Sequence, residues 1–157
     1  MKQTQIHKIC KAIAGLGPLG HLKASGTWGS VAALPFVCFL AGYMWLVLLT
    51  LIAFVVGVLV IRPLIQGQQD KDPSFVIIDE WVGQLAVFCF FPKGCLSPIL
   101  LIFGFLFFRL FDILKPWPAS FFDRKVHSGL GVMLDDLMAA IYAMIALAFM
   151  IKIGYNI

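Results

Sequence analysis

Long apolar stretches separated by short polar ones dominate this chain. The first stretch runs from Val31 to Ile61 without a charged residue. As a single helix at 1.5 Å per residue it would extend roughly 46 Å, whereas the hydrocarbon core of a bilayer is about 30 Å thick. A helical hairpin or re-entrant segment therefore fits residues 31–61 better than one straight helix, and Ala41-Gly42 is the expected bend.

The rest of the chain repeats this alternation. Further apolar stretches lie at 75–91, 96–114 and 137–151. Between the four stretches we expect a polar loop, a tight turn and a second polar loop, at 62–74, 92–94 and 115–134. A short helix is expected near Ile6–Ile13, and the last helix is expected to begin near Gly131. The pattern predicts an all-α polytopic membrane bundle of about four to five membrane segments. We expect one domain, 1–157, with 1–24 as a cytoplasmic N-terminal segment.

The composition excludes an ordinary soluble domain. Hydrophobic residues make up 61% of the chain and charged residues 13%, against roughly 25% charged residues in soluble domains. A domain of this size cannot hide so much apolar surface from water, so lipid must cover part of it. The net charge of +4 arises without a basic run, which favours an anionic lipid surface over nucleic acid as the partner.

The distribution of lysine and arginine predicts the orientation in the membrane. These residues concentrate in the N-terminal segment and in the two polar loops, whereas the short turn and the C-terminal tail contain only Lys93 and Lys152. Cytoplasmic loops carry an excess of basic residues. The N-terminus and both polar loops are therefore expected on the cytoplasmic side.

Ionisable residues gather near the expected cytoplasmic ends of the apolar segments. Charges within or next to membrane helices are costly and point to a functional site. The candidate catalytic residues are Asp79, Glu80, Asp112, Asp123, His127, Asp135 and Asp136.

Two adjacent pairs of acids, Asp79-Glu80 and Asp135-Asp136, are the candidate metal ligands. Mg²⁺ prefers oxygen ligands, including one or two carboxylates. Adjacent side chains on a helix diverge by about 100°, so we expect one member of each pair to face the bundle interior. The alternative is that these acids merely favour the positive end of a helix dipole.

Five residues are candidates for binding a phosphate group: Thr27, Ser30, Arg109, Lys115 and Arg124. Arg109 and Asp112 share a helix face, which Lys115 continues, although a simple salt bridge would use the same spacing. The stretch 26–30 is predicted to be a Gly-rich turn whose backbone N–H groups and hydroxyls could cradle a phosphate at a helix start. A capped helix without a ligand is the alternative there.

The cysteines do not indicate thiol chemistry. Four are present without close pairing, mainly in apolar stretches: Cys10, Cys38, Cys89 and Cys95. Free cysteine commonly behaves as a small hydrophobic residue. The sequence Leu-Ser-Pro-Ile-Leu-Leu after Cys95 lacks the arginine that would close a phosphate-binding loop.

Three groups of residues together resemble one bacterial membrane family, phosphatidylglycerophosphatase A. The first is Gly26-Thr27-Trp28-Gly29-Ser30, followed by 32–35, and the second is Asp79-Glu80-Trp81-Val82-Gly83. The third and longest runs from Phe108 to Asp136 and includes Lys115-Pro116-Trp117-Pro118 and Asp123-Arg124-Lys125-Val126-His127. Its length and unusual composition make chance agreement remote.

The resemblance implies a lipid phosphatase that converts phosphatidylglycerophosphate to phosphatidylglycerol and depends on Mg²⁺. It implies a multi-pass protein of the bacterial inner membrane with its active site on the cytoplasmic side. The partners expected are the phospholipid substrate and membrane lipid, with no nucleic acid and no obligatory protein partner.

Two nucleophiles fit the pattern: a water molecule activated by the metal, or one of the aspartates. Water is favoured as the nucleophile, because the acids are expected to be occupied as metal ligands. His127 is a candidate acid for the leaving glycerol oxygen, or a donor to the phosphate. The other classes considered are an ion or metal carrier and a non-enzymatic scaffold. A carrier would need charges throughout the membrane depth, whereas 137–151 contains none.

Overall fold

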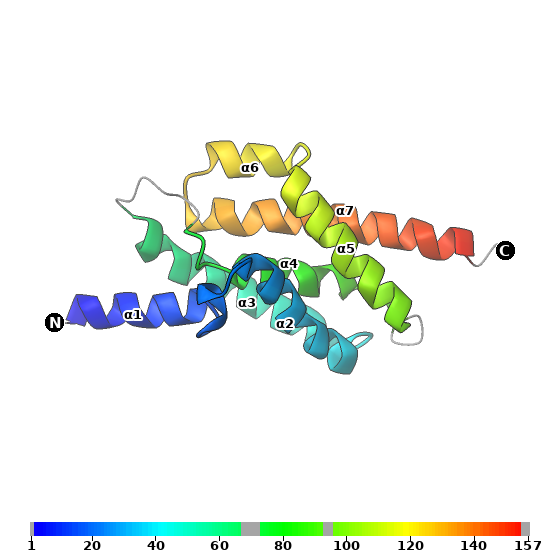
Figure 1. The fold of residues 1–157 in the computed structure, drawn as a ribbon, viewed down its shortest axis with the longest axis horizontal. Coiled ribbons are helices and arrows are strands. Elements are labelled where there is room, and N and C mark those ends of the chain that lie inside the picture. The colour runs from blue at the N-terminus through cyan, green and yellow to red at the C-terminus, as the bar shows by residue number, and fades with distance from the viewer. Residues whose placement is uncertain (1, 67–72, 93–95, 155–157) are drawn as a thin grey trace.

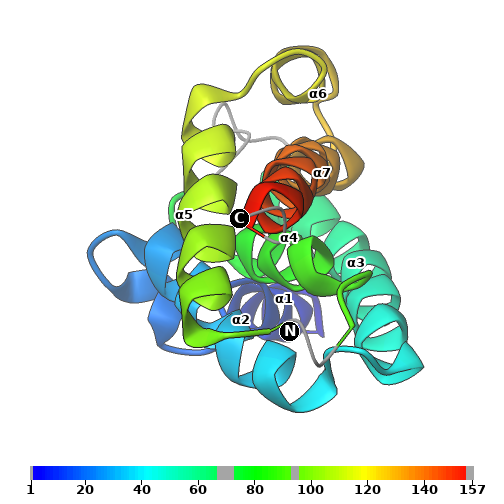
Figure 2. The same ribbon diagram turned by 90° about the vertical axis from the view of Figure 1, so that its right-hand side faces the viewer.

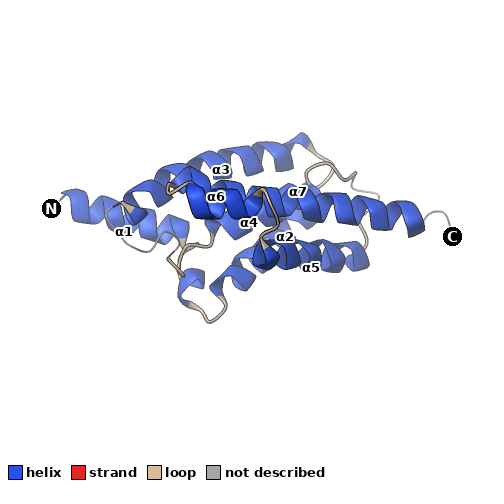
Figure 3. Ribbon diagram, turned by 90° about the horizontal axis from the view of Figure 1, so that it is seen from above, coloured by secondary structure: helices blue, strands red, loops and turns tan. Residues whose placement is uncertain are grey.

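The chain forms an elongated bundle of helices in which the two termini lie at opposite ends of the longest axis (Figure 1). This computed structural model describes residues 2–66, 73–92 and 96–154. Within these ranges the regular structure is entirely helical, with no strand (Figure 3). The elements in chain order are α1 Lys2–Ala14, η1 Leu19–His21, α2 Ser25–Leu40, α3 Met44–Ile65, α4 Ile78–Phe88, α5 Pro98–Leu114, α6 Ala119–Lys125 and α7 Gly129–Gly154.

The short helix α4 lies at the centre of the bundle. Viewed along the long axis, α2, α3, α5 and α7 surround it (Figure 2). Most of its residues are buried, including Val82, Leu85 and Phe88. Because α4 begins with Asp79 and Glu80 in its first turn, its acidic end is positioned by contacts with the helices around it.

Two helices, α3 and α7, are long and apolar enough to cross a membrane. The 26 residues of α7 give a helix of about 39 Å. The two helices approach closely where small residues remove side-chain bulk. Gly57 of α3 packs against Met133, and Gly129 packs against the backbone of α3, as small residues do between membrane helices. Large apolar side chains on α3 remain exposed, among them Leu51, Ile52, Val55 and Leu59.

The expected bend at Ala41-Gly42 is confirmed as the short turn between α2 and α3. Gly42 has a φ of 78°, a left-handed conformation that glycine adopts without steric cost. The apolar stretch 31–61 is therefore divided between two helices.

Several predicted boundaries were wrong. The expected turn at 26–30 lies inside α2, which begins at Ser25, and the expected loop at 115–134 contains α6 and the start of α7. Helix α3 also extends past Arg62 into the first expected loop. The tight turn at 92–94 and Cys95 fall partly or wholly outside the described residues.

Local sequence explains the ends of α5. Ser97 caps its start by accepting a hydrogen bond from the Leu100 N–H at 3.3 Å, and Pro98 occupies the first turn, where its missing N–H costs nothing. At the other end Lys115 adopts a left-handed conformation with a φ of 43°, followed by Pro116. This abrupt ending turns the Lys115 side chain toward α6 and α7.

Candidate active site

The starts of three helices and the C-terminal part of a fourth converge on one region of the bundle. The starts of α2 and α4, the second turn of α7 and the C-terminal end of α5 bring together most of the ionisable residues singled out in the sequence. The residues that meet in this region are more than 100 positions apart at the extremes, from Gly26 to Asp136. The tertiary fold rather than local sequence therefore builds the site.

Three carboxylates form the acidic cluster, which comprises Asp79, Glu80 and Asp136. One oxygen from each lies within 4.8 Å of the others. Asp79 is 4% exposed and Asp136 is 4% exposed. We expected only one member of each acidic pair to face the interior. The structure instead brings both Asp79 and Glu80 into the cluster, with Asp136 alone from the second pair.

The buried oxygens of this cluster have unused hydrogen-bonding capacity. Asp79 Oδ1 and Asp136 Oδ2 are buried without a hydrogen-bond donor. Buried carboxylates repel one another and need hydrogen bonds, protons or a cation to be tolerated. Convergent carboxylate oxygens are the ligands that hard divalent cations prefer, so the acidic cluster could hold a metal ion.

Arg109 lies beside the acidic cluster at the end of α5. Its Nη1 is 2.8 Å from Asp112 Oδ2 and 4.0 Å from Glu80 Oε1, and it donates to Ser30 Oγ at 3.5 Å. The salt bridge on one helix face is thus confirmed, and the same guanidinium also reaches two neighbouring helices. A planar group with several donors in this position is suited to bind phosphate oxygens.

Gly26 makes this approach possible. A methyl group at position 26 would overlap the Glu80 carboxylate and lie 3.3 Å from Arg109 Nη1. Ser30, one turn further along α2, is fully buried and donates its own hydroxyl hydrogen to the Gly26 carbonyl at 3.0 Å. The first turns of α2 therefore form one wall of the site.

Lys115 occupies a second ionic cluster adjacent to the first. Its Nζ lies 2.6 Å from Asp135 Oδ2 and 2.8 Å from Asp123 Oδ1. Burial alone would lower the pKa of Lys115, but the charge of Asp135 and hydrogen bonds to Asp123 and Asp135 outweigh it and raise that pKa. The ammonium is thus fixed in its charged form and ties the end of α5 to α6 and α7.

This arrangement separates the predicted site residues into two groups. Asp135, a candidate metal ligand, pairs with Lys115 and lies outside the three-carboxylate cluster. Lys115, a candidate phosphate ligand, is already held by two carboxylates. Arg124 and His127 are exposed, and His127 Nδ1 lies 3.3 Å from the Lys125 carbonyl oxygen. Thr27 is half-buried in the first turn of α2.

Sequence reasoning missed Gln84. This residue is fully buried in α4, one helical turn beyond Glu80, and both polar atoms of its amide are buried without a hydrogen-bond partner. The only other polar groups in the side chains between Glu80 and Phe91 are the indole N–H of Trp81 and the thiol of Cys89. Its spacing of four residues from Glu80 was the available signal, because residues four apart share a helix face.

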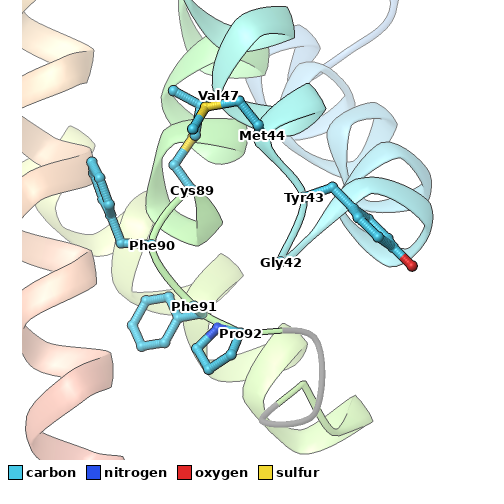
Figure 4. Close-up of a pocket in the computed structure, with 8 residues that line it drawn as sticks. All are labelled: Gly42, Tyr43, Met44, Val47, Cys89, Phe90, Phe91 and Pro92. Atoms are coloured by element: carbon cyan, nitrogen blue, oxygen red, sulfur yellow. The ribbon is translucent and has the colours of Figure 1, made fainter.

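An apolar pocket of about 400 Å³ lies at the other end of α4. Gly42, Tyr43, Met44 and Val47 line one side, and Cys89, Phe90, Phe91 and Pro92 line the other (Figure 4). Since Asp79 and Glu80 are in the first turn of α4 and Cys89 follows its last residue, this pocket is separate from the acidic cluster. Among the described residues that line it, none has an acidic or basic side chain.

Comparisons with known proteins identify a family and several relatives of this chain. The sequence model of the family "Phosphatidylglycerophosphatase A" matches residues 12–151. Phosphatidylglycerophosphatase A of Haemophilus influenzae is 36% identical over 125 residues, which cover 78% of this chain and 76% of the relative. The protein of the same name from Escherichia coli is 31% identical over 130 residues, covering 82% of this chain and 72% of the relative.

A third relative has a different provisional name. This Bacteroides thetaiotaomicron protein is named as a phosphatidylinositol-3-phosphatase and is 30% identical over 135 residues, covering 84% of this chain and 80% of its own. No solved structure shows a significant match. With a family match over most of its length, this chain belongs to the phosphatidylglycerophosphatase A family.

Proposed function

We propose that this protein hydrolyses the terminal phosphate of phosphatidylglycerophosphate, giving phosphatidylglycerol and inorganic phosphate. The observation that carries the proposal is the acidic cluster beside Arg109, in a chain of the phosphatidylglycerophosphatase A family. Hydrolysis of a phosphomonoester requires stabilisation of the phosphoryl oxygens and activation of a nucleophile. Convergent carboxylates next to a guanidinium supply groups for both requirements.

Asp79, Glu80 and Asp136 are assigned as the ligands of Mg²⁺. The unsatisfied oxygens of Asp79 and Asp136 fit such an ion, and the oxygen-only donor set suits Mg²⁺ better than softer metals. When bound, the ion would neutralise phosphate charge and make water a better nucleophile. The identity of the metal is part of the proposal.

Arg109 is assigned to bind the phosphoryl oxygens. Asp112 holds Nη1 at 2.8 Å and thereby fixes the plane of the guanidinium, which can present its other N–H groups to the phosphate. Ser30 stabilises the same side chain from α2. We propose Thr27 as a further donor to the phosphate.

The second ionic cluster is assigned a positioning role. Asp135 pairs with the Lys115 ammonium at 2.6 Å and directly precedes Asp136 in the sequence. The Lys115–Asp135 ion pair would therefore fix the part of the α7 backbone that carries a metal ligand. Asp123 anchors α6 through the same ammonium. We also propose that Arg124 contacts the phosphate and that His127 protonates the leaving glycerol oxygen.

The proposed setting is the inner membrane of a bacterium, with the site on the cytoplasmic side. The apolar length of α3 and α7 supports membrane insertion, and α2, α4 and α5 would complete four to five segments that include the α2–α3 hairpin. The basic residues of the two predicted polar loops, including Arg62, Lys115 and Arg124, support the cytoplasmic orientation. The substrate would enter sideways from the cytoplasmic leaflet while its acyl chains stay in lipid.

Product analysis tests this function. Purified protein in detergent is incubated with phosphatidylglycerophosphate in ¹⁸O-labelled water, and the lipid and phosphate products are identified by mass spectrometry. We expect phosphatidylglycerol and an equal amount of phosphate carrying one ¹⁸O from a single turnover. Cleavage to phosphatidic acid, or no product, would contradict the proposal. Label in an aspartate rather than in the phosphate would replace water with an aspartate as nucleophile.

A further inference from the structure

The buried amide of Gln84 has no role in the assignments above. Its side chain is 0% exposed, and neither Nε2 nor Oε1 has a hydrogen-bond partner. An enclosed amide without partners is strongly disfavoured, and most buried polar side chains are paired. Asp79 and Asp136 of the acidic cluster also have a buried polar atom without a hydrogen-bond partner. Unsatisfied polar atoms therefore concentrate around one site.

The packing of α4 places Gln84 next to that site. Glu80 lies one turn before it on the same face, against Gly26 and Arg109. The preceding residue, Gly83, packs against the ring of Phe108, which is the neighbour of Arg109 in α5. Gln84 therefore lies about 6 Å further along α4 than Glu80, within the interior bounded by the helices that form the phosphate site.

The chemistry of an amide differs from that of the charged groups assigned to the site. Carboxylates only accept hydrogen bonds and a guanidinium only donates them, whereas the amide of Gln84 does both and carries no charge. Arg109 and a metal ion are positively charged and bind the negatively charged oxygens of a phosphate. A neutral amide instead matches a hydroxyl group, which also both donates and accepts.

We propose that Gln84 binds the free hydroxyl of the glycerol unit that carries the reacting phosphate. This inference rests on the proposed function and makes Gln84 a specificity-determining residue for the lipid headgroup. The hydroxyl is on the carbon next to the phosphorylated one, so it lies within reach of a side chain one helical turn from a residue that holds the metal. Loss of one such hydrogen bond, with its buried partner left unsatisfied, reduces kcat/KM by about 10- to 100-fold.

The test compares two lipids that differ in that hydroxyl alone. One is phosphatidylglycerophosphate, and the other has propane-1,3-diol in place of the headgroup glycerol. The wild-type protein is expected to hydrolyse the first with a kcat/KM about 10- to 100-fold higher. Gln84→Met, which keeps the length of the side chain without its amide, is expected to bring that ratio close to one by slowing only the hydroxyl-bearing lipid.

The controls separate this inference from the proposed function. Thr50→Val removes a buried hydroxyl at a distance from the acidic cluster, where Thr50 bonds the Leu46 carbonyl at 2.8 Å, and should leave the ratio unchanged. Equal hydrolysis of both lipids by the wild-type protein overturns the role of Gln84 without any variant, even if Gln84→Met fails to fold. An unchanged ratio in a folded Gln84→Met overturns it as well. Hydrolysis of neither lipid by the wild-type protein contradicts the proposed function instead.

Discussion

Asp135 and Asp136 are neighbours on α7, yet their carboxylates belong to different ionic clusters. Asp135 Oδ2 lies 2.6 Å from Lys115 Nζ, whereas Asp136 joins Asp79 and Glu80. Both aspartates are buried, at 5% and 4% exposure. One short segment of helix thus supplies a structural ion pair and a candidate metal ligand, so substitutions at the two positions should have different consequences.

Removing one partner of the Lys115–Asp135 pair should destabilise the protein more than removing both. Lys115→Met removes the cation beside the buried Asp135 carboxylate, at a cost of about 3 kcal/mol, the low end for buried pairs because Lys115 is partly exposed. The double variant Lys115→Met with Asp135→Leu should recover part of that loss. Thermal unfolding in detergent measures each step, and additive effects of the two substitutions would show that the pair is not coupled.

The contribution of the Lys115–Asp135 pair to stability should not change with pH in the neutral range. Neighbouring carboxylates raise the pKa of Lys115, so its contribution to stability is complete below the usual lysine pKa and is lost only above it. The difference in melting temperature between wild type and Lys115→Met should therefore stay constant from about pH 6 to pH 9. A difference that disappears as the pH rises through this range would contradict the assignment of a strongly held ammonium.

Arg109→Lys should lower kcat/KM by about 10- to 100-fold while leaving the protein folded. Lysine keeps the positive charge beside Asp112 and Glu80 but cannot hold Asp112 and bind a phosphate in the planar geometry of arginine. Arg62→Lys is the matched control, because Arg62 is exposed in the last turn of α3. Equal activity of the Arg109 and Arg62 variants would reduce Arg109 to a partner in a salt bridge.

Gly26→Ala should reduce activity by at least about tenfold, although it adds only one methyl group. That methyl group would overlap the Glu80 carboxylate and approach Arg109, and small displacements of catalytic groups are costly. Gly154→Ala serves as the control, since a methyl group there meets no atom of the described residues within 4 Å. Phosphate release by the two variants is compared after both are shown to melt like wild type; full activity of Gly26→Ala would show that the close approach is not needed.

The local sequence pattern was sufficient to predict some parts of this structure. The apolar stretches predicted the helices, the break at Ala41-Gly42 followed from the length of a stretch that exceeds one crossing, and the three-residue spacing predicted the contact between Arg109 and Asp112. Each of these depends on residues close in sequence or on the thickness of a bilayer. The family resemblance was also visible in the motifs, and the comparisons confirmed it.

The remaining features depend on tertiary contacts. Lys115 and Asp135 are 20 residues apart and meet only because α5 ends in a left-handed residue and α7 begins near it. Helix α6 has seven residues, and its polar composition resembles a loop when its packing on α7 is unknown. The sequence could not reveal that both Asp79 and Glu80 face one cluster, since that depends on which helices surround the start of α4.

Asp79, Glu80 and Asp136 are proposed to hold a metal ion that lipid dephosphorylation requires. The most direct measurement is phosphate release from phosphatidylglycerophosphate by the purified protein, with Mg²⁺ or with EDTA, for wild type and Asp136→Asn. We predict release by wild type that requires Mg²⁺, and a loss of at least about 100-fold in folded Asp136→Asn at any Mg²⁺ concentration. Release that is unaffected by EDTA, or a fully active Asp136→Asn, would contradict the claim.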